Sequence, residues 1–238
     1  DFDEHTYLIK EAVLHIDGRI PVIAGTGANS TKEAVFLTQS AKKAGADACL
    51  LVTPYYNKPN QKGLFEHYKT INDAVDIPQI LYNVPARTGC DLENKTVISL
   101  SKLSNIIGIK DATGELERID FLKDKVKKSF IFISGDDLTF LDYMERGGCG
   151  VISVTANVKP DLMHNICHNF LNGNNEKSRT INNKLGSLHK ALFIDSNPIP
   201  VKWLLNYLGL INQGIRLPLV DLDKKYQTKL AEAFEAIK

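Results

Sequence analysis

The feature that most constrains the fold is a series of six short apolar segments separated by stretches with helical patterning. The segments are centred near Ile23, Leu51, Leu81, Ile109, Ile133 and Ile152. They are continuously apolar rather than alternating, which is typical of parallel strands covered on both faces. The first intervening stretch predicts a helix that begins with a capping box, Ser30 to Glu33, and closes at Gly45. Further helices are predicted near residues 62–74, 92–103, 116–128 and 137–146.

Repeated strand–helix units of this length form either an open doubly wound sheet or a (β/α)8 barrel. The barrel is favoured, because no G-x-G-x-x-G motif follows the first strand. Only six units are present, and after Ala156 the pattern is wholly helical, near residues 159–172, 175–193, 198–208 and 223–237. The sequence therefore predicts an α/β TIM barrel without its first two strands and the helix between them. Residues 1–156 would hold barrel units three to eight and residues 157–238 the C-terminal helices, in one structural domain.

The composition excludes several classes of protein. A net charge of +1 without a long basic run argues against nucleic-acid binding, and no apolar stretch approaches the roughly 18 residues needed to span a membrane. His164 and His168 are four residues apart but have no third ligand nearby, so no metal site is predicted. The widely spaced cysteines predict buried, reduced thiols in a cytoplasmic protein: Cys49, Cys90, Cys149 and Cys167.

Candidate catalytic side chains follow the second, third and fourth predicted strands. Lys110 ends an apolar run, where partial desolvation favours the neutral amine that attacks a ketone to form a Schiff base; an ordinary strand-end lysine would instead extend into solvent. Tyr56 and Tyr82 end the two preceding strands, and Arg87 lies on the loop after Tyr82. Each tyrosine alone is more often a rim aromatic. Together, an amine, phenols that transfer protons and a carboxylate-binding guanidinium predict a Schiff-base enzyme.

The last two predicted strands offer weaker signals. Gly135, at the end of the fifth, could admit a ligand close to the backbone, whereas Asp136 or Asp137 is interpreted as a cap of the next helix. The backbone of Ile152, in the sixth, could contact a small bound molecule.

Five segments carry a resemblance to a known family: residues 20–29, 52–57, 81–89, 107–110 and 197–202. They resemble the 4-hydroxy-tetrahydrodipicolinate synthases, also called dihydrodipicolinate synthases, and the similarity runs essentially from end to end. It implies a pyruvate-dependent lyase of the class I aldolase type, which condenses pyruvate with L-aspartate-4-semialdehyde to 4-hydroxy-tetrahydrodipicolinate in the diaminopimelate route to lysine. The resemblance implies no cofactor beyond the covalent Schiff base, and a homotetramer arranged as a dimer of dimers.

The resemblance also implies roles for single residues. Lys110 matches the Schiff-base lysine, Tyr82 the proton donor and acceptor beside it, and Arg87 the carboxylate-binding arginine. Tyr56 matches a relay tyrosine that reaches across a dimer interface, and Ile152 a position that contacts pyruvate through its backbone. The related N-acetylneuraminate lyases usually lack an arginine at the position of Arg87, which favours the synthase.

Members of the family that are inhibited by lysine bind it in a cleft between subunits. Four residues resemble the positions that line this cleft: His5, Asn29, Glu33 and Tyr55. For Glu33 the capping box is an equally good explanation. Lysine is therefore a candidate feedback inhibitor.

The chain departs from the family at its start. Complete members carry about fifty more residues before the position of Asp1, with two barrel strands and a Gly-Thr-Thr-Gly-Glu loop that serves the proton relay and the pyruvate carboxylate. Losing such donors commonly costs about 10²-fold or more in rate, and open strand edges would weaken the barrel. A chain of these residues alone is therefore expected to fold poorly or bind pyruvate weakly. Two alternatives stay open: a catalytically impaired subunit with a regulatory or structural role, and a pyruvate-dependent aldolase with another acceptor aldehyde.

Overall fold

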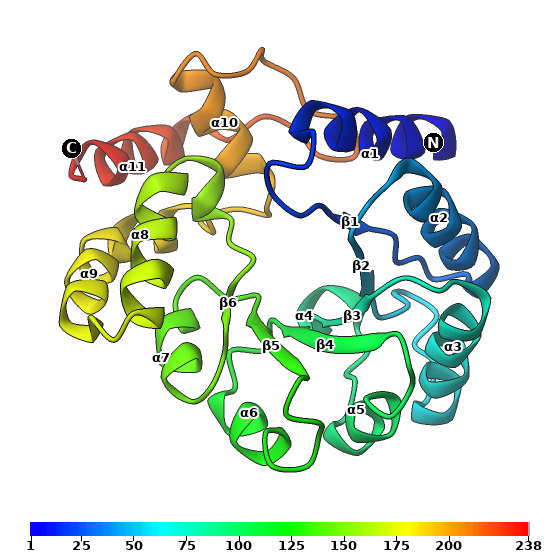
Figure 1. Ribbon diagram of the computed structural model, residues 1–238. Coiled ribbons are helices and arrows are strands. Elements are labelled where there is room, and N and C mark those ends of the chain that lie inside the picture. Colours follow the sequence, from blue (N-terminus) through cyan, green and yellow to red (C-terminus); the bar gives the residue numbers. More distant parts are fainter. Residues whose placement is uncertain (238) are drawn as a thin grey trace. The chain divides into compact units, whose positions relative to one another are not determined.

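Six strands form a parallel sheet whose order follows the chain in the computed structural model, which describes residues 1–237 (Figure 1). They are β1 (Ile23–Gly25), β2 (Ala48–Val52), β3 (Gln79–Asn83), β4 (Ile106–Asp111), β5 (Ile131–Ser134) and β6 (Gly150–Val151). The pairings from β1 to β5 are all parallel. All six predicted strands are therefore present, although β6 ends one residue before Ile152.

The chain divides into two compact units. The first comprises Asp1–Gly135 together with Arg146–Gly148, and the second comprises Asp136–Glu145 together with the chain from Cys149 onward. The predicted division was into barrel units at residues 1–156 and C-terminal helices at residues 157–238, within one structural domain. This division stays a prediction.

The first unit holds β1 to β5 and six helices. The helices are α1 (Phe2–Ile16), α2 (Thr31–Ala44), α3 (Gln61–Ala74), α4 (Pro85–Thr88), α5 (Asn94–Leu100) and α6 (Leu116–Leu122). Helices α2, α3, α5 and α6 lie on the outer side of the curved strands (Figure 1). Strand residues such as Leu51, Leu81 and Ile109 are fully buried, as expected for a sheet covered on both faces.

The start of α2 corrects one prediction. Gly45 does close this helix, in the left-handed conformation with φ of 92°. The capping box, however, is wrong, because the Ser30 side chain makes no capping hydrogen bond. Only the backbone begins the helix, with the Ala34 N–H donating to the Ser30 carbonyl at 3.0 Å.

Strands β4 and β5 approach each other closely at a glycine. Gly108 pairs with Ile131, and a methyl group at Gly108 would lie 2.5 Å from the Ile131 carbonyl oxygen. No side chain fits at that distance, so glycine is required for the two backbones to pair there. Lys110 follows two residues later on the same strand and pairs with Ile133.

A buried histidine connects α3 to the start of α2. His67 is 5% exposed, and its Nδ1 lies 2.9 Å from the Thr31 hydroxyl. Burial lowers the pKa of His67 from 6.5 to about 4, because the charged imidazolium is poorly solvated there. Between these two values the unfolded chain binds a proton that the folded chain does not, so stability present above about pH 6.5 is lost as the pH falls.

We therefore expect the free energy of unfolding of the wild-type chain to fall by about 3 kcal/mol more than that of His67→Gln between about pH 7 and pH 4. Denaturant titrations across this range measure the difference. The exposed His164 provides the matched control, and His164→Gln should follow the wild-type curve. Parallel curves for wild type and His67→Gln would contradict the prediction.

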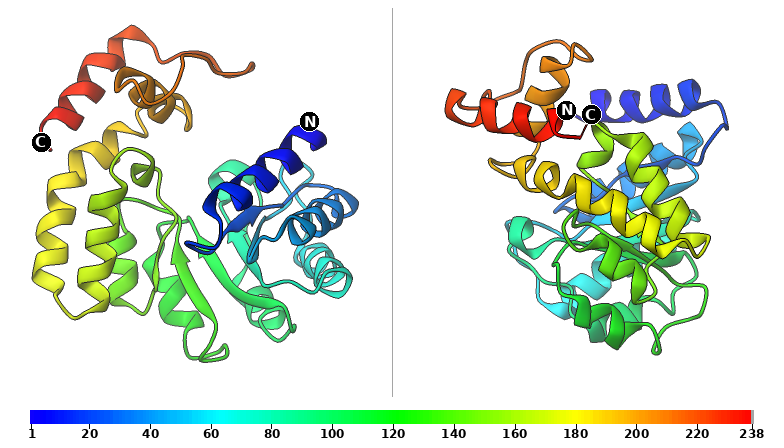
Figure 2. Two further views of the ribbon diagram at one scale, coloured as in Figure 1. Left: turned by 45° about the horizontal axis from the view of Figure 1, so that its top comes forward. Right: turned by 90° about the vertical axis from the view of Figure 1, so that its left-hand side faces the viewer.

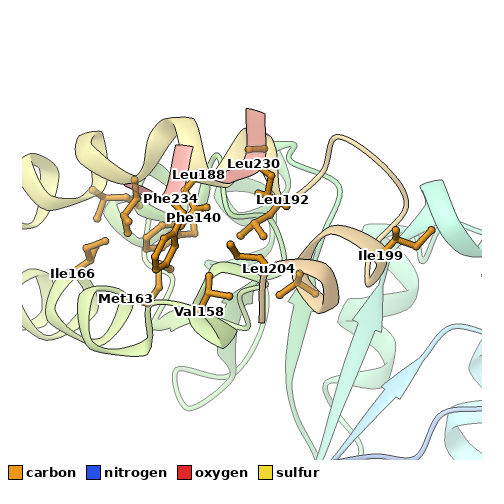
Figure 3. Close-up of a cluster of buried hydrophobic side chains, with 14 of the residues drawn as sticks. Phe140, Val158, Met163, Ile166, Leu188, Leu192, Ile199, Leu204, Leu230 and Phe234 are labelled. Atoms are coloured by element: carbon orange, nitrogen blue, oxygen red, sulfur yellow. The ribbon is translucent and has the colours of Figure 1, made fainter. Parts of the chain in front are cut away.

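The second unit is helical apart from β6. It holds α7 (Phe140–Glu145), the short 3₁₀ turn η1 (Thr155–Asn157), α8 (Pro160–Leu171), α9 (Asn175–Ala191), α10 (Ile199–Tyr207) and α11 (Lys224–Glu235). Helices α8 and α9 lie side by side (Figure 2). Side chains from all five helices form one apolar core, which includes Phe140, Ile166, Leu188, Leu204 and Leu230 (Figure 3). The four predicted C-terminal helices are thus confirmed.

The four cysteines are all free, but not all are buried. Cys49 and Cys90 are buried, as predicted. Cys167 is partly exposed and Cys149 is exposed, so the prediction of buried thiols is wrong for Cys149. Within residues 1–237, no helix is both long and apolar enough to cross a membrane.

Candidate active site

Lys110 and Tyr82 lie side by side at the carboxyl ends of β4 and β3. The two residues pair in the sheet register, so both side chains project from the same face. The Lys110 Nζ lies 4.1 Å from the centroid of the Tyr82 ring, and Lys110 as a whole is only 8% exposed. Lys110 therefore does not extend into solvent. The arrangement places an amine and a phenol where both can reach one small molecule.

The ionisation of Tyr82 reflects this environment. Burial raises its pKa, because the phenolate is poorly solvated, and the positive charge of Arg87 acts in the opposite direction with a smaller effect. Tyr82 therefore holds its proton firmly near neutral pH.

Gly135 lies against one side of the Lys110 side chain. Its N–H donates to the Asp111 carbonyl at 2.7 Å, immediately after β5. A methyl group at Gly135 would lie 2.8 Å from the Lys110 Cε and 2.7 Å from the Ala112 Cβ. The backbone of Gly135 therefore packs directly against the Lys110 side chain, and there is no room for a larger residue.

Arg87 is presented by a short helix after β3. Helix α4 has a proline at its first position, Pro85, and ends at Gly89 in the left-handed conformation. Arg87 lies in its last turn and is exposed. The buried Thr53, at the end of β2, donates its N–H to the Tyr82 carbonyl at 2.9 Å and so ties the ends of β2 and β3 together.

Tyr56 is placed differently from the other candidates. Its side chain is in solvent, with 89% of the residue exposed, and its backbone has φ of 72°. The Tyr56 N–H donates to the Thr88 carbonyl at 3.3 Å, which fixes this loop beside α4. A left-handed backbone is uncommon for a bulky residue such as tyrosine, because the Cβ crowds the backbone, and a tyrosine ring so exposed to water is also uncommon.

The four candidate lysine-binding residues lie near the ends of β1 and β2 and at the start of α2. His5 Nε2 is 2.8 Å from the Gly25 carbonyl oxygen at the end of β1. The Asn29 side-chain amide donates to the Tyr55 carbonyl at 3.3 Å, so these two loop residues are in contact. Glu33 is half-buried in the first turn of α2.

The two aspartates after β5 have different roles. Asp136 resembles the predicted cap, because its carboxylate accepts the Thr139 N–H at 2.9 Å just before α7. Of the two residues offered as the cap, Asp136 therefore takes this position and Asp137 does not. This residue is 1% exposed, and its carboxylate accepts the N–H groups of Val154 and Thr155, each at 3.0 Å. Asp137 therefore holds the chain that follows β6.

That chain includes Ile152, which is half-buried directly after β6 in the second unit. The Thr155 hydroxyl also lies 2.7 Å from Nδ1 of the buried His189 on α9. Burial lowers the pKa of His189, although Asp137 acts in the opposite direction. The segment after β6 is thus held from two sides by buried polar groups.

A metal site finds no support among the described residues. No group of three or more potential ligands occurs within residues 1–237. His164 and His168 are exposed on α8, with stacked rings whose centroids are 5.5 Å apart.

One polar cluster behind Lys110 and Tyr82 was not predicted. Asn83 and Asp111 are buried on the opposite face of the same two strand ends, and Arg118 on α6 pairs with Asp111. A signal was present in the sequence. A buried strand that ends in asparagine or aspartate must satisfy that side chain, so a partner from the covering helix could have been sought.

Three comparisons place the chain among known proteins. The model of the dihydrodipicolinate synthetase family matches residues 1–237. The 4-hydroxy-tetrahydrodipicolinate synthase of Pseudomonas aeruginosa is 56% identical over 233 residues, which are 98% of this chain and 80% of that protein. The chloride-inhibited dihydrodipicolinate synthase of Acinetobacter baumannii, solved with pyruvate, has a TM-score of 0.97 at 51% identity and covers 100% of this chain and 81% of that one. The enzyme of Cyanidioschyzon merolae, solved with lysine bound, has a TM-score of 0.96 at 36% identity, with coverages of 100% and 81%.

The family match extends over residues 1–237. The family model matches from residue 1, so it does not bear out the prediction that an N-terminal part of the family is missing here. The sheet of six parallel strands agrees with the solved structures of the family. An identity of 56% over nearly the whole sequence shows that this chain belongs to the dihydrodipicolinate synthetase family.

Proposed function

We propose that this chain is a 4-hydroxy-tetrahydrodipicolinate synthase, which condenses pyruvate with L-aspartate-4-semialdehyde through a Schiff base on Lys110. The observation that carries the proposal is the buried amine of Lys110, 4.1 Å from the Tyr82 ring, in a chain 56% identical to a protein of that name. No metal or other cofactor takes part, because the lysine imine itself withdraws electrons from the bound pyruvate.

The first half-reaction uses Lys110 and Tyr82. The neutral Lys110 amine attacks the ketone carbon of pyruvate and forms a carbinolamine. Tyr82 gives its proton to the carbinolamine oxygen, which leaves as water when the imine forms. The raised pKa of Tyr82 suits this role, because the phenol is protonated when the step begins. The Tyr82 phenolate left by this step takes a proton from the methyl group of the protonated imine, which gives an enamine and restores the phenol. The enamine carbon then attacks the aldehyde of the second substrate.

Substrate binding is assigned to residues around this pair. Arg87 binds a carboxylate, a role supported by its place on the short helix after β3 and by an exposed guanidinium that can form two parallel hydrogen bonds. Gly135 contributes to substrate binding in this proposal, because its backbone packs against the Lys110 stem and so helps to position the amine. Ile152 contacts pyruvate through its backbone, a role supported by the hydrogen bonds that Val154 and Thr155 donate to Asp137, which fix the segment after Ile152.

Tyr56 acts across a subunit interface in this proposal, within a homotetramer that is a dimer of dimers. Its support is the exposure of the side chain, 89%, on a loop that α4 holds in place. An aromatic ring so exposed on one chain is well suited to packing against a second. The six strands are units three to eight of a (β/α)8 barrel, as the TM-score of 0.97 supports. The four free thiols support a reducing compartment, the cytoplasm.

A competition assay tests the proposal. The protein is given pyruvate with equal concentrations of aspartate-4-semialdehyde and a neutral sugar aldehyde, and both condensation products are quantified. We expect the semialdehyde to be consumed at least tenfold faster. Preference for the sugar aldehyde would favour the N-acetylneuraminate lyase type of reaction, and consumption of neither would favour an impaired subunit. The synthase names of the relatives do not favour either alternative.

Lysine is proposed as a feedback inhibitor bound by His5, Asn29, Glu33 and Tyr55. Support comes from the contact of Asn29 with Tyr55, from the absence of the competing capping box at Glu33, and from a relative that binds lysine. We expect millimolar lysine to inhibit turnover, and Glu33→Gln to weaken this inhibition about tenfold or more, because it removes a carboxylate that pairs with the lysine ammonium. Titrations of initial rate against lysine measure the effect. Equal inhibition constants would exclude Glu33 from the site.

A further inference from the structure

A buried charge cluster lies behind the two proposed catalytic side chains. Lys110 and Tyr82 pair in the register of β4 and β3, and the next pair along is Asp111 with Asn83. Because successive side chains in a strand project from opposite faces, Asp111 and Asn83 face the covering helices rather than the site. Both are at the strand ends, and they are 5% and 0% exposed.

Arg118 on α6 is the centre of this cluster. Its side chain is 11% exposed and donates from Nε to the Asp111 carboxylate at 3.0 Å. Its two terminal nitrogens donate to the Asp91 carboxylate at 3.2 Å and to the Leu92 carbonyl at 2.7 Å. The guanidinium thus uses its fork of donors on three separate acceptors, which a lysine ammonium cannot do with the same geometry.

The Asp91 branch extends the cluster to β3. The Asn83 amide donates to the second oxygen of Asp91 at 2.7 Å, and the Asn83 oxygen accepts the Leu92 N–H at 3.0 Å. The Asn83 backbone carbonyl accepts the Ala112 N–H at 2.9 Å. Arg118 therefore holds the end of β4 directly through Asp111, and the end of β3 through Asp91.

The cluster also has an electrostatic consequence for Lys110. Asp111 is its immediate neighbour, and a buried carboxylate without a counter-charge would favour the ammonium form of an adjacent lysine. The Arg118 guanidinium lies on that carboxylate and neutralises its charge. Burial alone would lower the pKa of Arg118, but Asp111 and Asp91 outweigh burial and raise it, so the arginine stays charged.

We propose that Arg118 is a positioning residue for the Schiff-base reaction: it holds the ends of β3 and β4 in register, and it cancels the charge of Asp111 so that Lys110 can react as the neutral amine. This inference rests on the proposed function. It adds a residue that touches neither substrate nor the reacting atoms and acts only through Asp111, Asp91 and Asn83.

The test is the pH dependence of pyruvate trapping. Wild type, Arg118→Met, Asp111→Asn and the double variant are incubated with pyruvate and cyanoborohydride from about pH 5.5 to pH 9, and the rate of adduct formation is followed by intact-mass spectrometry. For Arg118→Met we expect an at least tenfold lower rate of adduct formation at neutral pH. The acid limb of the pH–rate curve, where the rate falls as Lys110 becomes protonated, should move up by about one pH unit, because Asp111 now stabilises the ammonium. Asp111→Asn should move the limb down, since the negative charge next to Lys110 is removed while the positive charge of Arg118 stays.

The double variant gives the decisive comparison. Removing both charges should return the acid limb to its wild-type position, even if the maximal rate stays low because the strand ends are less well held. A purely structural role would lower the rates without moving the limb. Arg118→Lys should keep the limb in place and lower the maximal rate, because it keeps the charge and loses the fork.

A matched control is Arg179→Met. Arg179 also pairs with two carboxylates, those of Asp142 and Glu145, but it is 40% exposed and belongs to the second unit. It should leave the limb unchanged. If Arg118→Met does not fold, Asp111→Asn and Arg118→Lys still test the proposal. A limb that stays in place in folded Arg118→Met or Asp111→Asn would overturn it, whereas an absence of adduct in wild type would instead overturn the proposed function.

Discussion

Alanine at Lys110 is expected to abolish the pyruvate adduct and to lower turnover by about 10⁴-fold or more, because the reaction loses its nucleophile and the covalent route with it. The adduct is measured by intact-mass spectrometry after incubation with pyruvate and borohydride. Turnover is measured with both substrates at saturation. Stability should change little or improve, because removing a buried amine also removes the cost of keeping it from water.

The control for this result is an exposed lysine. Lys102, which follows α5, lies on the surface, and Lys102→Ala should form the adduct at the wild-type rate. Retention of a single stoichiometric adduct in Lys110→Ala would show that another amine is the nucleophile. Tryptic mapping of the reduced adduct would then identify it.

Alanine at Gly135 is expected to lower turnover by about 10²-fold while the chain remains folded. Its methyl group would lie 2.8 Å from the Lys110 Cε and 2.7 Å from the Ala112 Cβ, so the lysine stem must move aside and the chain at Ala112 must shift, at a cost in stability. That movement displaces the amine from its position near Tyr82, and a displacement of about 1 Å in a reacting group commonly costs 10²-fold in rate. Turnover and the thermal midpoint, measured on the same preparation, separate the two effects.

Gly186 provides the matched control for the added methyl group. It lies within α9, and a methyl there would meet no atom within 4 Å. Gly186→Ala should keep full turnover and stabilise the chain by up to about 1 kcal/mol, as glycine-to-alanine changes in helices do. Full turnover in Gly135→Ala would show that the position of Lys110 tolerates displacement.

Periodicity predicted the strand–helix alternation well, because the strands are apolar throughout and the helices have regular buried stripes. Helix α3 was expected near residues 62–74 and spans Gln61–Ala74. Helix α1 was missed, and the reason is physical. Only Ile9 of its fifteen residues is buried, and Tyr7, Leu8 and Leu14 are exposed, so its apolar residues do not mark one buried face.

Only part of the candidate site could be predicted from the sequence. The positions of Lys110 and Tyr82 at the ends of two predicted strands were enough to predict that they lie together, because parallel strands present their carboxyl ends at one edge of the sheet. Arg118 could not be found in this way, since its partners Asp111 and Asp91 depend on how α6 packs against two strand ends. The sequence could not decide between Asp136 and Asp137 as the helix cap for a similar reason, because the bonds of Asp137 depend on how the chain after β6 packs.

The division of the chain into units has a consequence for its synthesis on the ribosome. Helix α7 belongs to the second unit, yet the chain returns to the first unit at residues 146–148 before the rest of the second unit is made. The apolar side chains of Phe140, Leu141 and Met144 share one core with residues of α8 to α11, so this core is complete only when Phe234 has emerged. At about 5–20 residues per second, the core around α7 stays incomplete for several seconds and leaves apolar surface that nascent-chain chaperones can bind.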